Sequence, residues 1–298
     1  MTLSPRSKDL FAGYAFVLPA FLFLAVFLGF PIVYNVALGF QHADAMNLKA
    51  PVKEFIGLNN FQELWDSGVL GTALVNTVAF TLGSLIIQFI GGLVLALFFD
   101  LSFPGSQRLR GLMVVSWMIP TVATALLFKF MLSPSSGVLN DLLVGLRLSA
   151  QPVAWLSNPA TAMFGVILAN SWVGISFNMI LLATGLTTIP REVYESARMD
   201  GAGAVRQFFQ LTVPLLKPTM LAILLLGFIY TFKVFDLIFV MTNGGPVNAT
   251  EVLSTYSYRL SFSVYQFGQG AAAADVLFLC LVLVAVGYLR LIRTEEVQ

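Results

Sequence analysis

Six long apolar segments constrain the fold of this chain more than any other feature of its sequence. They occupy residues 11–40, 71–99, 109–133, 161–188, 217–242 and 271–292. A transmembrane helix needs about 20 consecutive, mostly apolar residues, and every segment reaches that length. The first segment follows Arg6 and Lys8, as a signal peptide would, but its length and the five later segments favour a retained helix. The sequence therefore predicts an all-α integral membrane protein with six transmembrane helices.

Composition supports a membrane protein and argues against several other classes. Hydrophobic residues make up 58% of the chain and charged residues only 10%, whereas about 25% of an ordinary soluble domain is charged. The net charge of +1, without a basic arm or basic helix, argues against a nucleic-acid partner. The single cysteine, Cys280, excludes an internal disulfide, and the single histidine, His42, leaves little from which to build a histidine-ligated metal site. Lipid is therefore expected to be the solvent for much of the chain.

The distribution of basic residues predicts on which side of the membrane each loop lies. Of the 16 lysines and arginines, ten fall in segments on the same side as the N-terminus and four in loops on the other side, while Lys129 and Lys233 lie within apolar segments. Because cytoplasmic loops are enriched in lysine and arginine, both termini are expected in the cytoplasm. No linker or low-complexity segment interrupts the chain, so residues 1–298 are expected to form a single multi-pass domain in the cell membrane.

Residues 189–216, on the expected cytoplasmic side, form the longest polar interruption in the second half of the chain. Thr187 or Thr188 is expected to cap a short helix that begins near Pro190 and ends near Met199. The sequence thus predicts an ordered cytoplasmic segment here.

The rest of this loop predicts a tight turn and a second short helix. Gly201 and Gly203 are expected to turn the chain sharply, because glycine accepts positive φ. The second helix is expected over residues 204–211, with Pro214 and Pro218 ending it before the next span. Two short helices joined by a tight turn can move as a rigid body. The alternative is a helix-turn-helix that packs only against its own bundle.

The same stretch resembles the EAA loop of permease subunits of ABC importers. That pattern has a Glu-Ala-Ala triplet, a glycine after three further residues, and an Ile-x-Leu-Pro ending after nine more. The residues that match it are, in order, Glu195, Ser196, Ala197, Gly201, Leu211, Val213 and Pro214. The departures are serine for alanine, leucine for isoleucine and valine for leucine, and all of them conserve size.

Further motifs resemble the carbohydrate group of these permeases, the maltose and glycerol-phosphate type. Residues 235–246 read FDLIFVMTNGGP, and residues 265–279 read YQFGQGAAAADVLFL. The Leu-Asn-Asn-Phe sequence at residues 58–61 fits the same group. The resemblance covers nearly the whole chain, from Gly13 to Leu291.

The resemblance implies a type I ABC importer permease fold and a set of partners. These are cytoplasmic ABC ATPase subunits, a second homologous permease, an extracytoplasmic solute-binding protein and a sugar-like substrate. The chain lacks the phosphate-binding pattern GxxxxGK[ST], so ATP and Mg are expected on the partner ATPase, and this chain is expected to be non-catalytic and to hold no cofactor. The residues expected to couple to the ATPase are Glu195, Ser196, Ala197, Asp200, Gly201, Ala202, Phe208, Leu211 and Pro214.

The family also implies a substrate cavity between two permeases, lined by the helices that flank the polar loop. In the helix after the loop, one face is expected to carry the residues at i, i+3, i+4 and i+7, which are Gly227, Tyr230, Thr231 and Val234. The candidates for lining the path are Trp172, Val173, Gly174, Phe177, Gly227, Tyr230, Thr231 and Val234. Aromatic rings and hydroxyls suit stacking and hydrogen bonding to a sugar, but small and hydroxyl residues also line ordinary contacts between membrane helices.

Charged residues within the apolar segments leave a second function open. Lys233 and Asp236 are three residues apart and are expected to form a structural ion pair, with the alternative that either faces the translocation path. The competing function is an ion-coupled secondary transporter that uses Asp236, Asp275 or Lys233. The EAA-like loop favours the ATP-driven importer. An intramembrane enzyme is disfavoured because the chain has no GxSxG, no HExxH and one histidine.

Overall fold

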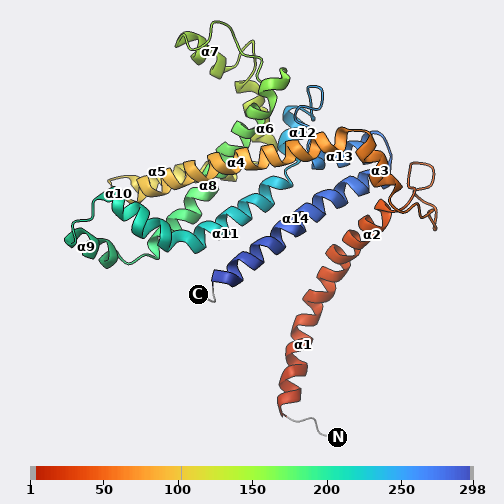
Figure 1. Ribbon diagram of the computed structural model, residues 1–298, viewed down its shortest axis with the longest axis horizontal. Helices are drawn as coiled ribbons and strands as arrows, with labels where there is room; N and C mark the ends of the chain where they lie inside the picture. The colour runs from red at the N-terminus through yellow and green to blue at the C-terminus, as the bar shows by residue number, and fades with distance from the viewer. Residues whose placement is uncertain (1–4, 102, 296–298) are drawn as a thin grey trace. The chain divides into compact units, whose positions relative to one another are not determined.

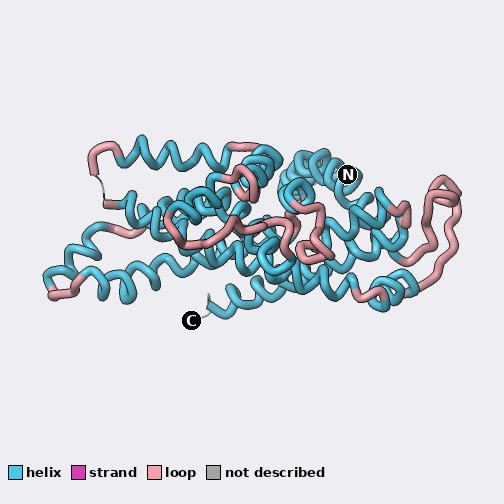
Figure 2. The backbone as a smooth tube through the Cα atoms, turned by 90° about the horizontal axis from the view of Figure 1, so that it is seen from above, coloured by secondary structure: helices cyan, strands magenta, loops and turns pink. Residues whose placement is uncertain are grey.

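The computed structural model describes residues 5–101 and 103–295, and these residues are almost entirely helical (Figure 1). Figure 2 shows helices joined by loops throughout the described chain, and the β-structure there consists of one isolated bridge between Gln41 and Phe55. The chain divides into two compact units, one of Met1–Ser67 with Ser257–Phe278 and one of Gly68–Tyr256 with Leu279–Gln298. The prediction of an all-α protein is confirmed.

The first unit begins with one long helical run that matches the first predicted span. It consists of α1 (Pro5–Leu24), the π-helical turn η1 (Ala25–Gly29) and α2 (Phe30–Gly39). Proline lacks an N–H and breaks the hydrogen-bond ladder of an ordinary helix. Here Pro31 stands in the first turn of α2, directly after the π-turn, and the run continues. Residues Gly13–Gly39 are long and apolar enough to cross a membrane.

Polar contacts organise the rest of the first unit, which contains α3 (Asn59–Asp66), η3 (Arg259–Ser263) and the start of α14 (Phe267–Glu295). The buried amide of Asn60 donates to the carbonyls of Gly39 and Gln41, at 2.8 and 2.9 Å. Gln269 on α14 donates to the carboxylate of Glu63 on α3 at 2.6 Å. Side-chain hydrogen bonds therefore tie the end of α2, α3 and the start of α14 together.

Two long helices, α4 (Val69–Asp100) and α8 (Pro159–Thr187), form the centre of the second unit. They approach closely at glycines of α4. A Cβ added at Gly92 would lie 2.5 Å from the Cβ of Asn178, and one added at Gly91 would lie 2.9 Å from the side chain of Ile175. Small residues at such positions are how membrane helices bring their backbones together.

The third apolar segment, predicted as a span over residues 109–133, is bent in the structure. It forms α5 (Ser106–Met118) and α6 (Thr121–Met131), whose axes meet at 96°. The cause is Pro120, which disfavours helical backbone at the preceding residue; Ile119 is accordingly extended, with ψ 131°. Another short helix, α7 (Val138–Gly145), follows α6.

The fifth apolar segment departs from prediction at both ends. The helix begins at α10 (Ala204–Gln207) and continues through the π-turn η2 (Phe208–Thr212) into α11 (Val213–Phe232). Pro214 and Pro218 therefore do not end a helix, because the π-turn changes the hydrogen-bond register where Pro214 enters. At the other end the expected span to residue 242 breaks after Phe232, and α12 (Asp236–Met241) and α13 (Leu253–Tyr258) follow.

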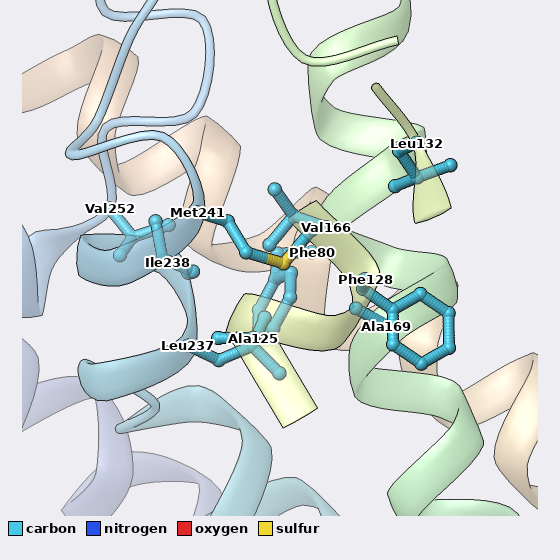
Figure 3. Close-up of a cluster of buried hydrophobic side chains, with 10 residues drawn as sticks. All are labelled: Phe80, Ala125, Phe128, Leu132, Val166, Ala169, Leu237, Ile238, Met241 and Val252. Atoms are coloured by element: carbon cyan, nitrogen blue, oxygen red, sulfur yellow. The ribbon is translucent and has the colours of Figure 1, made fainter. Parts of the chain in front are cut away.

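An apolar core holds α4, α6, α8 and α12 together within the second unit. Figure 3 shows the ten buried side chains of this core, with Val166 and Met241 beside Phe80. Close packing of such side chains provides the van der Waals contacts that hold the short helices α6 and α12 on the bundle. The bent and broken segments are thus packed parts of the fold.

Five helices are long and apolar enough to span a membrane, and α5 with α6 supplies a sixth if the bent pair counts as one span. The described chain therefore has five or six candidate spans, and the prediction of six transmembrane helices stays a prediction. The cytoplasmic location of both termini and the organisation as a single domain stay predictions.

Candidate coupling loop and substrate-facing surface

The predicted first helix of the polar loop is present as α9 (Arg191–Met199). Glu192 lies in its first turn and Arg198 in its last, where each charge complements the helix dipole. The expected cap is wrong, because the Thr188 hydroxyl donates to the carbonyl of Gly185 at 2.7 Å and closes α8 instead. Pro190 stands at the N-cap position of α9, where its missing N–H costs no hydrogen bond.

The turn after α9 is a Schellman motif centred on Gly201. Gly201 has φ +77°, the left-handed conformation that glycine adopts without strain. Its N–H donates to the carbonyl of Arg198 at 3.0 Å, and the N–H of Ala202 donates to the carbonyl of Ala197 at 2.9 Å. Gly203, in contrast, has φ −69° and does not need to be glycine for its backbone conformation. The prediction of a tight turn is confirmed for Gly201 only.

Side-chain hydrogen bonds lock the two halves of the loop together. Gln207 on α10 donates to the carbonyl of Ala202 at 2.6 Å. The hydroxyls of Tyr194 on α9 and Thr212 on η2 are 3.0 Å apart. Thr212 is buried, and Tyr194 packs against an apolar cluster that includes Ile189 together with residues of α8 and α11. The loop is therefore a rigid unit seated on the ends of α8 and α11.

A cavity of about 940 Å³ lies between this loop and the end of α4. Glu195 and Phe208 line it, together with Tyr194, Arg198 and Gln207. The remaining expected coupling residues lie on α9, in the turn, on η2 and at the start of α11. Of these, Ser196, Asp200, Gly201 and Pro214 are exposed, and Ala197, Ala202 and Leu211 are half-buried. The sequence pattern thus marks a surface that is open to a partner.

Three of the helices in the second unit bring aromatic rings together. Phe177 of α8 lies between Trp117 of α5, at a centroid distance of 5.7 Å, and Tyr230 of α11, at 6.1 Å and nearly perpendicular. Trp117 and Tyr230 are about half exposed, so this aromatic surface faces outward from the bundle. Its rings have the geometry in which aromatic pairs attract one another.

The remaining path candidates separate into exposed and packing residues. Trp172 is half exposed, and Val173 is half-buried. Gly174 faces Gln88 so closely that a Cβ would overlap that side chain, and Gly227 packs against Leu85. Their small size serves helix packing, as the alternative interpretation held.

The expected common face of α11 is not found. Thr231 is buried at 4% exposure whereas Tyr230 is 57% exposed. The helix ends at Phe232, so Val234 lies beyond it and packs against the core around Phe80. The helical spacing is lost because the helix ends before Lys233. The local sequence pattern did not indicate this helix end.

The predicted ion pair between Lys233 and Asp236 is wrong. In the described part of the chain no such pair forms, and the Lys233 ammonium lies 5.5 Å from the ring centroid of Tyr230. Because α11 ends at Phe232, Asp236 lies in the first turn of another helix, α12, and the two residues no longer have helical i, i+3 spacing.

Two other charged residues in or near the apolar segments have hydrogen-bond partners. Lys129 donates to the carbonyl of Val240 at 3.0 Å. Asp275 belongs to the first unit and accepts a hydrogen bond from Asn35 at 2.8 Å.

Sequence reasoning missed Trp117, Tyr194 and Thr212. Trp117 is 60 residues from Phe177, and only the bend at Pro120 and the contact of α5 with α8 bring the two rings together. A sequence signal for Tyr194 and Thr212 does exist, because each places a hydroxyl group at an otherwise packed position of the loop. Their pairing follows from the turn at Gly201, which sets α9 beside η2.

Comparison with known proteins decides the family. Residues 88–294, more than half of the chain, match the model described as "Binding-protein-dependent transport system inner membrane component". This chain belongs to that family. The permease MalF of the trehalose/maltose transport system of Thermococcus litoralis is 31% identical over 293 residues, which cover 98% of this chain and 97% of the relative. The sulfoquinovosyl glycerol transport system permease protein SmoG of Agrobacterium fabrum is 34% identical, over 91% of this chain and 88% of the relative.

Solved structures agree with the sequence relatives. A chain of a bacterial ABC transporter involved in the import of the acidic polysaccharide alginate matches this permease with a TM-score of 0.80 and 25% identity, over 96% of both chains. The resemblance to carbohydrate-group ABC importer permeases is therefore confirmed, and the type I permease fold with it. Membership of this family decides against an ion-coupled secondary transporter. The roles of individual site residues stay predictions.

The Schellman turn makes a matched pair of substitutions possible. In Gly201→Val, a β-branched residue is forced to φ +77°, which we expect to cost about 1–2 kcal/mol. Gly203→Val is the control, since a Cβ at either glycine meets no atom within 4 Å and only Gly201 has positive φ. Hydrogen exchange of the Ala202 amide should become about tenfold faster in Gly201→Val and stay unchanged in Gly203→Val. Equal exchange in both variants would show that φ at Gly201 does not stabilise the turn.

Proposed function

We propose that this permease is the membrane-spanning subunit of an ATP-driven, binding-protein-dependent importer of a sugar or sugar derivative. The observation that carries the proposal is the rigid loop of residues 189–216, in which the EAA-like residues surround the turn at Gly201 and stay accessible. A loop that is both stiff and exposed transmits a displacement instead of absorbing it. ABC ATPase subunits are its proposed partner, and they would hold ATP and Mg, so this chain itself needs no cofactor and performs no catalysis.

The loop is connected directly to the helices that carry the aromatic surface. On one side α9 follows α8, which carries Phe177. On the other side residues Ala204–Phe232 form one apolar helical run that carries Tyr230. The hydrogen bond between Tyr194 and Thr212 joins these two connections at the loop. A movement imposed on α9 would therefore displace α8 and α11 together, which is the change that alternation between inward-open and outward-open states requires.

The aromatic surface suits a saccharide. Sugar rings present apolar C–H faces that stack on aromatic rings, and hydroxyls that hydrogen-bond to a phenol such as Tyr230. Because Trp117, Phe177 and Tyr230 face outward from one bundle, we propose that a second homologous permease completes the cavity opposite them. The relatives named for trehalose/maltose and sulfoquinovosyl glycerol transport support a sugar-like substrate. A solved alginate transporter in complex with a pentasaccharide-bound periplasmic protein supports an extracytoplasmic solute-binding partner.

The orientation completes the proposal. We place both termini and the loop of residues 189–216 in the cytoplasm, because ten of the 16 basic residues lie on that side. The protein is then a multi-pass component of the inner or plasma membrane, with α7 and the segment around Val247 on the outer side.

Coupling is tested by two glutamates of the same short helix. Glu195 and Glu192 are both exposed on α9, but only Glu195 lines the cavity beside the loop. Glu195→Ala should lower ATP-dependent uptake by about tenfold or more, the effect expected for a contact worth at least ~1.4 kcal/mol at an interface. Glu192→Ala is the control and should keep uptake near the original rate. Uptake is measured per assembled complex in proteoliposomes, and equal activity of both variants would remove Glu195 from the coupling surface.

Orientation is tested with an impermeant thiol reagent on sealed cells, with Cys280 replaced by alanine. Val247 is 90% exposed and Val205 is 73% exposed, so a cysteine at either position is accessible to reagent on its own side. Val247→Cys should react in intact cells, and Val205→Cys should react only after the membrane is permeabilised. Reaction of Val205→Cys in intact cells would contradict the proposed orientation.

The aromatic surface is tested by truncation of Tyr230. Tyr230→Ala should raise the sugar concentration for half-maximal uptake by roughly threefold to tenfold, because one aromatic contact is lost. Leu226→Ala is the control, since Leu226 is an exposed apolar residue of the same helix outside the aromatic cluster. Tyr230→Phe separates the ring from its hydroxyl. An unchanged concentration dependence in Tyr230→Ala, with normal assembly, would place Tyr230 outside the substrate path.

A further inference from the structure

A second cavity, of about 700 Å³, lies between the end of α4, the start of α5 and the end of α8. Three arginines line it: Arg108 and Arg110 on α5, and Arg191 at the first position of α9. Asp100 is the acidic residue among its lining residues. The cavity therefore has an excess of positive charge, and it lies outside both the aromatic surface and the motif residues of the loop.

The arginines have no partner among the residues that the structure describes. None of their guanidinium groups makes a hydrogen bond or an ion pair with another described residue. A guanidinium group presents five N–H donors in a planar fork that matches the oxygens of a phosphate. Three such groups around one cavity are a recognition site for a phosphate group.

Part of the cavity wall is apolar. This part consists of Ala96, Phe99, Phe103 and Ala183. The rings of Phe99 and Phe103 are stacked with centroids 6.3 Å apart. A free phosphate ion gains nothing from such a wall, whereas the glycerol and upper acyl chains of a lipid bury apolar surface against it.

The position of the cavity relative to the apolar helices fits a lipid. It is bounded by the C-terminal ends of α4 and α8, both apolar enough to span, and by the start of α5. The ends of transmembrane helices lie near the boundary between hydrocarbon and water, where phospholipid headgroups are found. Basic pockets between membrane helices on the cytoplasmic side are sites for anionic headgroups.

We propose that this cavity binds the phosphate headgroup of an anionic phospholipid of the cytoplasmic leaflet. The choice of leaflet rests on the proposed orientation, but the binding chemistry does not. Arg191 makes the site relevant to transport, because it lines both this cavity and the cavity beside the coupling loop. A bound headgroup would hold the first residue of α9 and so stabilise the position of the loop on the bundle.

The test is lipid binding to the assembled transporter, followed by native mass spectrometry. Phosphatidylglycerol and phosphatidylcholine with identical acyl chains are titrated separately, and phosphatidylglycerol should bind more tightly. The double variant Arg108→Gln with Arg110→Gln should weaken phosphatidylglycerol binding by about thirtyfold, roughly fivefold for each arginine. The control is Arg147→Gln with Arg206→Gln, which removes the same charge from arginines that do not line the cavity and should leave binding unchanged.

Further measurements distinguish a bound lipid from a soluble phosphate compound and from a contact with the ATPase. Phe103→Ala should weaken phosphatidylglycerol binding, and glycerol 3-phosphate at the same concentration should not displace the lipid. Equal affinity for both lipids, an unaffected Arg108/Arg110 double variant, or displacement by glycerol 3-phosphate would overturn the proposal. So would loss of ATPase co-purification in the double variant with lipid binding intact, because the arginines would then contact the ATPase. None of these measurements requires transport, so failure of the proposed function is seen separately.

Discussion

The close packing of α4 against α8 is the constraint on which the rest of the second unit depends. Lipid tails are as apolar as leucine, so apolar side chains alone give membrane helices little reason to associate. Here glycines of α4 bring the backbones together, and Gln88 donates from α4 to the carbonyl of Asn170 on α8 at 3.2 Å. Buried polar residues continue along α4 at Thr77, Thr81 and Ser84, spaced by four and three residues. The α5, α6, α11 and α12 helices all pack against this pair or against each other.

The same packing positions the two candidate sites. The rigid centre fixes α8, and α8 carries Phe177 at the aromatic surface and ends where the coupling loop begins. Ile189 and Leu216 are buried in one apolar cluster, so both ends of the loop are anchored to the bundle. What remains accessible is the outer surface of α9 and its turn. Anchored ends and an exposed turn are what a loop needs in order to receive force from outside and pass it to the helices.

Sequence reasoning succeeded where a local rule decides the conformation. The apolar segments, α9 and the turn at Gly201 follow from hydropathy, proline and glycine within a few residues. It missed the bend at Pro120, although proline is a local signal. It also failed where distant packing decides, as in the helix end before Lys233 and the ring contact of Trp117 with Phe177. Pro214 was misjudged because a proline after a π-turn is tolerated, and sequence reasoning did not foresee the π-turn.

The helical run from Ala204 to Phe232 gives a physical reason for that π-turn. Its 29 residues span about 40 Å at ~1.5 Å per residue, so it can act as one lever between the coupling loop and the aromatic surface. A helix broken at Pro214 would bend there and lose the displacement. The π-turn η2 keeps the run continuous, and the helix ends at Phe232, shortly after Tyr230. The ring that faces Phe177 therefore lies in the last turn of this lever, and a displacement entering at Ala204 would arrive where the substrate is expected to pass.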